Sequence, residues 1–197
     1  MPPTPAAPAA PAAPAAPAAP AAPAAAVPDR ALEDLVEHLR TRFYGLYRGV
    51  VTDNDDPATL GRVKAQVPAV FGEVESAWCM PCVPYAGPQV GVAFLPEIGS
   101  GVWIEFEGGD VSYPIWVGCY WRGGELPSDV APDVKVIVTT SPLEVKLDDG
   151  AGSITVTDAN GNTATLDSSG ITLSNGGMQV VVGSSSVSVN SGALEVT

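Results

Sequence analysis

The last part of the chain alternates apolar and polar residues within very short segments. Between residues 143 and 197, these segments are separated by turns rich in Gly, Asn, Asp and Ser. Strict alternation places every second side chain on one face of a β-strand. The apolar positions hold Ile, Leu and Val, whereas the intervening positions hold mostly Thr, Ser and Gln. The pattern therefore predicts a strand-rich region that carries one apolar stripe.

Strands this short cannot enclose a hydrophobic core within one chain of this length. Identical chains can do so by winding around a common axis with their apolar stripes turned inward. We therefore expect residues 143–197 to form an intertwined trimeric β-helix, or prism, that is a rigid needle. The core of this homotrimer is predicted to contain the apolar residues of the stripe, namely Ile154, Val156, Leu166, Ile171, Leu173, Val180, Val182, Val187, Val189, Leu194 and Val196.

Composition and charge narrow the functional classes. The 197 residues include 22 acidic and 9 basic side chains, for a net charge of −13. Nucleic-acid binding needs a basic surface to neutralise phosphates, and anionic membranes likewise attract basic proteins. We therefore expect no nucleic acid as a partner. No Lys or Arg follows Lys146, so the acidic residues of the needle are expected to keep it soluble. A metal or tip-protein contact at the far end is the alternative.

Residues 1–27 form a low-complexity tail. Pro recurs at every third position from Pro5 to Pro23, with Ala pairs between. This spacing excludes a continuous helix, so we expect disorder or local polyproline II structure, as a spacer or a dispensable tail. The tail lacks the charged start and bulky apolar stretch of a secretory signal, and no apolar run of about 20 residues follows. We expect synthesis in the cytoplasm without a signal peptide, and no stable membrane insertion.

A short helix is predicted over residues 28–43. Asp29 is suited to be its N-cap, because its carboxylate can accept a hydrogen bond from a free N–H of the first turn. Apolar residues then follow at the three- and four-residue spacing of an amphipathic helix, namely Leu32, Leu35, Val36 and Leu39.

Residues 44–124 are expected to form a small closed β-barrel, joined to the needle by a linker at residues 125–142. Short strands without helical periodicity alternate with turns rich in Gly, Asp and Pro. The expected strands span residues 44–52, 61–67, 78–84, 90–95, 102–106 and 114–120. The aromatic residues expected in the barrel interior or at a trimer contact are Trp103, Phe106, Trp116 and Tyr120. The carboxylates expected to be solvated, not catalytic, are Glu97, Glu105, Glu107 and Asp110.

The barrel region resembles a known family. The resemblance is carried by the segments YRGVVTDNDDP (47–57), GRVKAQVP (61–68), PYAGP (84–88), FLPEIG (94–99), GVWIEFEGGD (101–110) and PIWVG (114–118), with Trp78 between them. Together they are similar to the oligosaccharide/oligonucleotide-binding-like (OB-fold-like) barrel of phage baseplate central spikes. The same module occurs in baseplate assembly protein V, in the valine-glycine repeat protein G of type VI secretion, and in spikes of extracellular contractile injection systems.

The resemblance implies a role that the residues alone do not. The barrel would be a trimeric collar that binds the tail hub and tube-initiator proteins. The needle end would receive a small tip protein with proline-alanine-alanine-arginine repeats. The function implied is mechanical, non-enzymatic piercing of a target envelope by a component of a virion or phage-tail-like particle. It assigns no catalytic, cofactor-binding or metal-binding residue.

One departure from some family members changes the expected activity. Certain spikes carry a lysozyme domain between barrel and needle, and others begin with a large hub domain. The linker at residues 125–142 is far too short for a folded enzyme. We therefore expect no muramidase activity, and a hub that is a separate protein.

The strongest competing motif is a Cys-x-x-Cys pair, Trp78-Cys79-Met-Pro-Cys82. Disulfide oxidoreductases place such a pair at a helix N-terminus, where the thiolate is stabilised. Here Val83-Pro-Tyr-Ala-Gly-Pro88 follows, which cannot form that helix. In a strand, the two Cα atoms would be about 10 Å apart, beyond disulfide reach. Adding Cys119 and the single histidine, His38, gives a poor zinc set, so buried free thiols are expected.

Other functional classes stay open as alternatives. A trimeric receptor- or sugar-binding tail fibre would also be rich in β-structure and would be expected to carry a globular recognition head. A disulfide oxidoreductase would use Cys79 and Cys82. A nucleic-acid-binding barrel would need a basic groove with stacking aromatic residues, which this acidic chain lacks.

Overall fold

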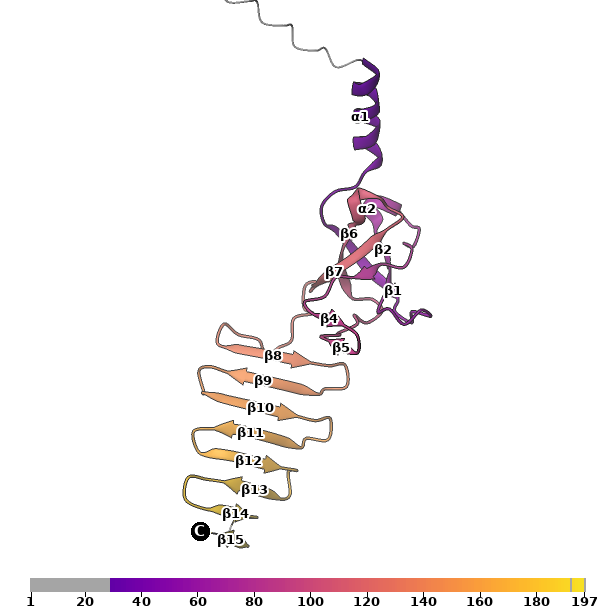
Figure 1. Ribbon diagram of the computed structural model, residues 1–197. Helices are drawn as coiled ribbons and strands as arrows, with labels where there is room; N and C mark the ends of the chain where they lie inside the picture. The colour runs from indigo at the N-terminus through magenta and orange to yellow at the C-terminus, as the bar shows by residue number, and fades with distance from the viewer. Residues whose placement is uncertain (1–28, 192, 197) are drawn as a thin grey trace, which may run out of the picture.

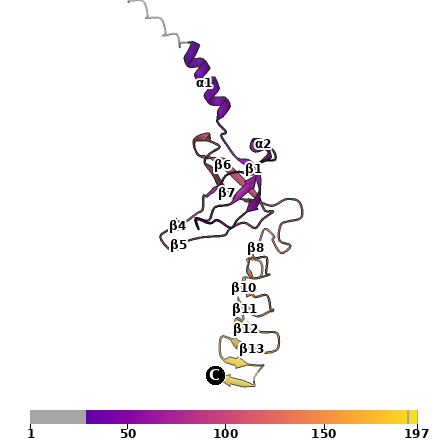
Figure 2. The same ribbon diagram turned by 90° about the vertical axis from the view of Figure 1, so that its right-hand side faces the viewer.

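The computed structural model of the protein describes residues 29–191 and 193–196. The low-complexity tail expected at residues 1–27 lies outside this range. The described chain is elongated, with a helix at one end, a small β-domain next to it, and a ladder of strands that leads to the carboxyl end (Figure 1). Figure 2 shows the ladder as a narrow stack beneath the β-domain. Among the described residues, no helix is long and apolar enough to cross a membrane.

Helix α1 (Asp29–Thr41) projects away from the β-domain (Figure 1). Its base is held by Arg42, whose Nη1 lies 2.9 Å from the Oδ2 atom of Asp110. The N–H group of Phe43 donates to the carbonyl of Gly109 at 2.9 Å, and its ring packs edge-on against Phe106. The apolar stripe of the helix is exposed along its whole length, at Leu32, Leu35, Val36 and Leu39.

The β-domain is a five-stranded sheet in the order β2-β1-β6-β7-β3. Its strands are β1 (Tyr47–Asp53), β2 (Lys64–Gln66), β3 (Met80–Pro81), β6 (Gly101–Phe106) and β7 (Pro114–Tyr120). The two outer strands are brought together by an antiparallel bridge between Val63 and Cys79, whose N–H groups donate to each other's carbonyls at 3.3 and 2.7 Å. This bridge closes the sheet into a barrel, as the strand pattern predicts. The core contains Val51, Val63, Ala65, Val67, Cys79, Val102, Ile104, Phe106 and Trp116.

Some barrel strands are shorter than expected from the sequence. Within the segment 78–84, pairing is limited to the Cys79 bridge and to strand β3, and Pro81 and Pro84 have no N–H group to donate to a longer ladder. The segment 90–95 contributes only β5 (Val90–Gly91), which pairs with β4 (Ala86–Gly87) in a separate hairpin. Two short elements are not predicted by the sequence pattern: helix α2 (Pro68–Phe71), which begins at a proline, and the 3-10 turn η1 (Glu107–Gly109).

The rest of the chain forms one eight-stranded antiparallel meander, which we call the needle sheet. Neighbouring strands in space are neighbours in sequence. They are β8 (Val134–Val138), β9 (Glu144–Asp148), β10 (Ser153–Thr157), β11 (Thr163–Asp167), β12 (Gly170–Ser174), β13 (Gln179–Val182), β14 (Val187–Val189) and β15 (Leu194–Val196). Strand β8 lies inside the segment 125–142 that was expected to be linker. It belongs to the sheet because its backbone pairs with β9 along its whole length.

Candidate functional site

The needle sheet has one apolar face. Residues directly opposite each other in an antiparallel ladder project to the same side. Ile154 is opposite Leu147 on one neighbour and Leu166 on the other, and the same relation continues from strand to strand. We call the resulting surface the apolar face. It contains Ile137, Val145, Leu147, Ile154, Val156, Ala164, Leu166, Ile171, Leu173, Val180, Val182, Val187, Val189 and Leu194. Its one charged member is Lys135 on β8, which lies opposite Leu147 and pairs with Asp149.

Every residue that the sequence predicts for the trimer core and whose side chain the structure describes lies on this face. The backbone of Val196 is paired with Val187, and so stands at the corresponding register position. The prediction missed Ile137, because strand β8 was read as linker. It also left out Val145 and Leu147, although their segment alternates in the same way.

The apolar face is more exposed than the polar face opposite. The side chains of Ile154, Val156 and Leu173 are 42%, 46% and 50% exposed. On the other face, Thr155 and Thr172 are less exposed, and each is half-buried. Monomeric soluble proteins rarely expose a continuous apolar surface of this extent. The face therefore has the character of half of an interface.

Turns at the strand ends hold the meander in register. The Asp158 carboxylate accepts hydrogen bonds from the amide side chain and the N–H group of Asn162, and from the N–H group of Asn160. These hydrogen bonds lower the pKa of Asp158, and the bond from the Asn162 side chain has the largest effect. Asp167 is used in the same way by Ser169. These acidic residues therefore have a local structural role in the turns, in addition to the charge they add.

The barrel loop between β1 and β2 is built around one carboxylate. Asp56 accepts hydrogen bonds from the N–H groups of Ala58 and Leu60, and its side chain is only 4% exposed. The guanidinium of Arg62 reaches back to it, with Nη2 and Oδ1 2.6 Å apart. This bond and the backbone donors hold the pKa of Asp56 far below its usual range. The cluster is fully paired and fixes the loop, so it offers no free group for catalysis.

The aromatic residues divide between the inside and the outside of the barrel. Phe106 and Trp116 are buried, and the indole N–H of Trp116 donates to the carbonyl of Gly61 at 3.2 Å. Trp103 and Tyr120 lie outside the core, with their ring centroids 5.0 Å apart. The guanidinium of Arg48 covers both rings, 5.4 Å from one centroid and 5.3 Å from the other.

The four barrel carboxylates that the sequence singles out differ in environment. Glu97 and Glu107 are exposed, Glu105 is half-buried, and Asp110 pairs with Arg42.

The Cys-x-x-Cys motif has the wrong environment for redox chemistry. Cys79 is fully buried, its sulfur lies 3.3 Å from the hydroxyl of Ser76, and burial raises the pKa of its thiol. A catalytic thiol needs the opposite shift. Cys82 and Cys119 are exposed. The expectation that the thiols would be buried is therefore wrong for these two, because strand alternation turns Cys82 outward when Cys79 points inward.

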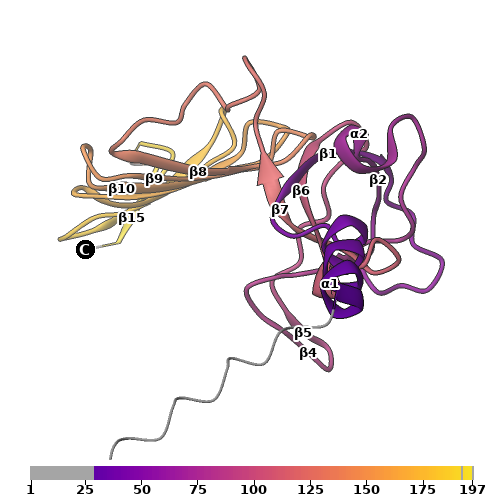
Figure 3. The same ribbon diagram turned by 90° about the horizontal axis from the view of Figure 1, so that it is seen from above.

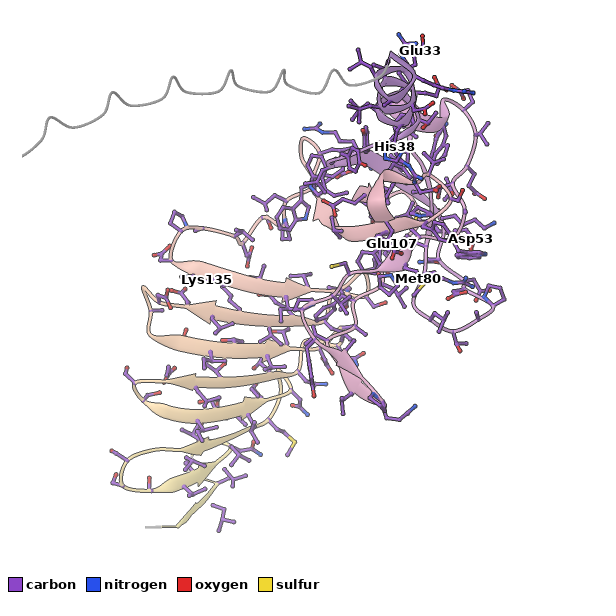
Figure 4. All side chains as sticks on the ribbon, turned by 45° about the horizontal axis from the view of Figure 1, so that its top comes forward. Glu33, His38, Asp53, Met80, Glu107 and Lys135 are labelled. Carbon is purple, nitrogen blue, oxygen red and sulfur yellow. The ribbon has the colours of Figure 1, made fainter. Side chains whose placement is uncertain are left out.

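His38 does not join the cysteines. Figure 4 shows it on helix α1, well apart from Met80, which lies between Cys79 and Cys82 in the sequence. Among the described residues, no group of three His, Cys, Asp or Glu side chains is arranged to hold a metal ion.

Comparison with known families matches both parts of the chain. Residues 47–121 match the type VI secretion system/phage-baseplate injector OB domain, and residues 135–195 match the phage baseplate V C-terminal trimerisation domain. Together the two matches cover more than two thirds of the chain. The boundaries agree with the barrel and with the needle sheet, β8 included.

Two curated relatives from Pseudomonas aeruginosa are similar in sequence. The type VI secretion system spike proteins VgrG2a and VgrG2b are each 31% identical over 90 residues, which is 44% of this chain. The aligned part is 11% of the first relative and 9% of the second, so the chain spans about a tenth of the length of the relatives it matches. With an OB domain followed by a baseplate V trimerisation domain, the chain belongs to the family of phage baseplate and type VI secretion spike proteins.

Proposed function

We propose that this chain is the central spike of a contractile, phage-tail-like injection system and that it pierces a target envelope by mechanical force alone. The observation that carries the proposal is the continuous apolar face of the needle sheet, exposed in a single chain. A trimerisation domain covers the same strands. Three copies related by a three-fold axis bury the three faces against one another and form a closed prism.

A prism of this kind suits a piercing role. Eight strands at a spacing of about 4.8 Å give a ladder about 34 Å long. Each strand runs across the axis and each apolar residue packs against residues of all three copies. Bending or unzipping the rod would expose apolar side chains along its length, at a cost of roughly 25 cal/mol per Å². The short polar turns leave the outer surface smooth and acidic.

The two ends of the rod serve different partners in this proposal. The barrel end, with helix α1, binds the hub and tube-initiator proteins of the tail. The β15 end receives a small tip protein with proline-alanine-alanine-arginine repeats.

A receptor- or sugar-binding tail fibre is the second candidate, because it would use the same trimeric needle. No observation on the described residues favours it, since from β9 to β14 the apolar face carries only apolar side chains and from β10 onward the polar face carries mainly small Thr and Ser side chains. A glycan array with the full chain tests it directly. Specific retention of one glycan class at micromolar affinity would replace the piercing proposal.

The piercing proposal is tested in the particle. Val182→Asp places a charge on the apolar face, whereas Thr172→Asp places the same charge on the opposite face. Cells that make the particle with Val182→Asp should yield tails without a spike and should lose delivery into target cells. The Thr172→Asp particles should deliver normally. Full delivery by particles that lack the spike would refute the piercing role.

A further inference from the structure

A small hairpin leaves the barrel without packing on its core. Strands β4 and β5 are two residues each, and the Val92 N–H donates to the Tyr85 carbonyl at 3.0 Å. We call residues 85–92 the arm. The side chains of Tyr85, Val90 and Val92 are exposed, and the arm has no charged residue. A two-stranded hairpin of this size is not stable in water by itself, so a further surface is needed to cover it.

The arm projects toward the side on which other copies must lie. Lys146, on the polar face of β9, pairs with Asp129 of the linker at 3.0 Å, so the linker crosses the polar face. Figure 3 shows the linker on one side of the needle sheet and the β4–β5 hairpin on the other. The arm is therefore on the side of the apolar face. It also lies at the height of strand β8, the first strand of the needle (Figures 1 and 2).

A hollow lies at the same height, where the barrel meets the needle. Its volume is about 840 Å³. We call it the junction hollow, and its walls include Ile98, Cys119, Trp121, Arg122 and Val138. Ile98 and Trp121 are 63% and 66% exposed, which is unusual for side chains of this size. The basic group of the hollow, Arg122, is already paired with Glu125 at 2.6 Å, and Glu97 is the remaining charged wall residue, so the hollow favours an occupant without acidic side chains.

We propose that the arm of each copy lies in the junction hollow of a neighbouring copy, so that three arms lock the three barrels together. The two surfaces are different parts of the same chain, and a contact of this head-to-tail kind closes into a ring under three-fold symmetry. The occupant and the hollow match in chemistry, because an uncharged apolar hairpin meets exposed Ile and Trp side chains. The hollow includes Val138 of the polar face and Pro127 of the linker, so the contact joins the apolar-face side of one copy to the linker side of the next. It rests on the trimer, not on the piercing role.

The native thiol in the hollow provides the test. In a Cys82→Ser background, Gln89→Cys or Val92→Cys adds a thiol to the arm, and Cys119 is the matching thiol of the hollow. The full-length trimer is treated with a short bis-maleimide and separated on a denaturing gel. We expect dimer and trimer bands that form at least about tenfold faster than in the matched Cys119→Ser control, since the two thiols are held at a high effective concentration. Peptide mass analysis should identify the 89–119 or 92–119 linkage between chains.

The experiment distinguishes a wrong arm contact from a protein that does not form a trimer at all. A protein of trimeric native mass that gives no interchain product at either arm position refutes it. So does a linkage within one chain, or cross-linking that appears only when a hub or other protein is added. A monomeric native mass refutes both the arm contact and the trimeric needle. A second readout is thermal: Trp121→Ala should lower the melting temperature of the barrel in the trimer, and deletion of the arm should lower it no further in that variant.

Discussion

Ile154 and Leu166 lie opposite each other on strands β10 and β11, on the same face of the needle sheet, and are 42% and 44% exposed. A cross-strand apolar pair in the middle of a ladder is ordinarily covered by a second layer. The described chain provides no second layer over these two residues, as the single sheet in Figures 1 and 2 shows. Their exposure shows, at one pair, that the apolar face of the needle sheet needs other copies of the chain to cover it.

The first prediction concerns that pair. Ile154→Asp should prevent trimer formation, because three carboxylates would be buried around one axis and each costs several kcal/mol to desolvate. Thr155→Asp, one residue away on the opposite face, should leave the trimer intact. Native mass spectrometry measures both. An Ile154→Asp variant that still ran as a heat-resistant trimer would contradict the buried axis.

A second prediction concerns Gly170, which begins strand β12 with φ at +131°. A Cβ atom added there would lie 2.0 Å from the carbonyl oxygen of Val182 on the neighbouring strand. Gly170→Ala should therefore separate β12 from β13 locally and lower the melting temperature of the needle by several degrees. Gly177→Ala is the control, because its Cβ atom would meet only one side-chain atom, at 3.9 Å. Equal melting temperatures for the two variants, measured by circular dichroism, would contradict this prediction. They would show that β12 and β13 can shift to make room for the Cβ atom.

The third prediction addresses the barrel core. Ile104 is fully buried on β6, next to the half-buried Glu105. Ile104→Ala should destabilise the barrel by about 2–5 kcal/mol, through lost burial and the cavity left behind. Glu105→Ala should change it by less than about 1 kcal/mol. All four tryptophans lie between Trp78 and Trp121, so tryptophan fluorescence in urea reports on the barrel and not on the needle. Equal urea midpoints would refute the assigned core.

The fourth prediction is a pH dependence. The hydrogen bond from Arg62, with the backbone donors, keeps the pKa of Asp56 far below its usual value of 3.8. A carboxyl whose pKa is lowered in the folded state stabilises the fold at any pH above its usual pKa. This stabilisation is lost as the pH falls from the usual pKa toward the lowered one. Asp56→Asn should therefore be less stable than the native chain at pH 7. The difference between them should narrow steadily from about pH 4 to pH 2. A constant difference over that range would show that Asp56 acts without its charge.

The fifth prediction separates the thiols. Cys79 is fully buried and the pKa of its thiol is raised, whereas Cys82 is exposed. Iodoacetamide should modify Cys82 at least about a hundredfold faster than Cys79 in the native protein, because modification of Cys79 requires local opening. Peptide mapping measures the two rates. Insulin reduction should stay at the level of the blank, and turnover that was lost in Cys79→Ser would restore the oxidoreductase hypothesis.

Part of this architecture was readable from local pattern. The alternation from Ser153 to Leu194 predicts the apolar face residue by residue, because the two-residue period of a strand depends only on the order of the side chains. Strand β7 was placed at its observed bounds for the same reason. The segment 78–84 was over-extended, because alternation does not reveal which N–H groups are missing at prolines.

Short-range periodicity and turn residues were enough to predict a small barrel and a ladder with one apolar face. Three features became visible only in the folded chain: Val63 and Cys79 close the barrel, strand β8 belongs to the needle, and the arm stands on the side of the apolar face. These features depend on which segments pair across long stretches of chain. That choice is made by hydrogen bonding and packing between distant residues, which no local pattern specifies.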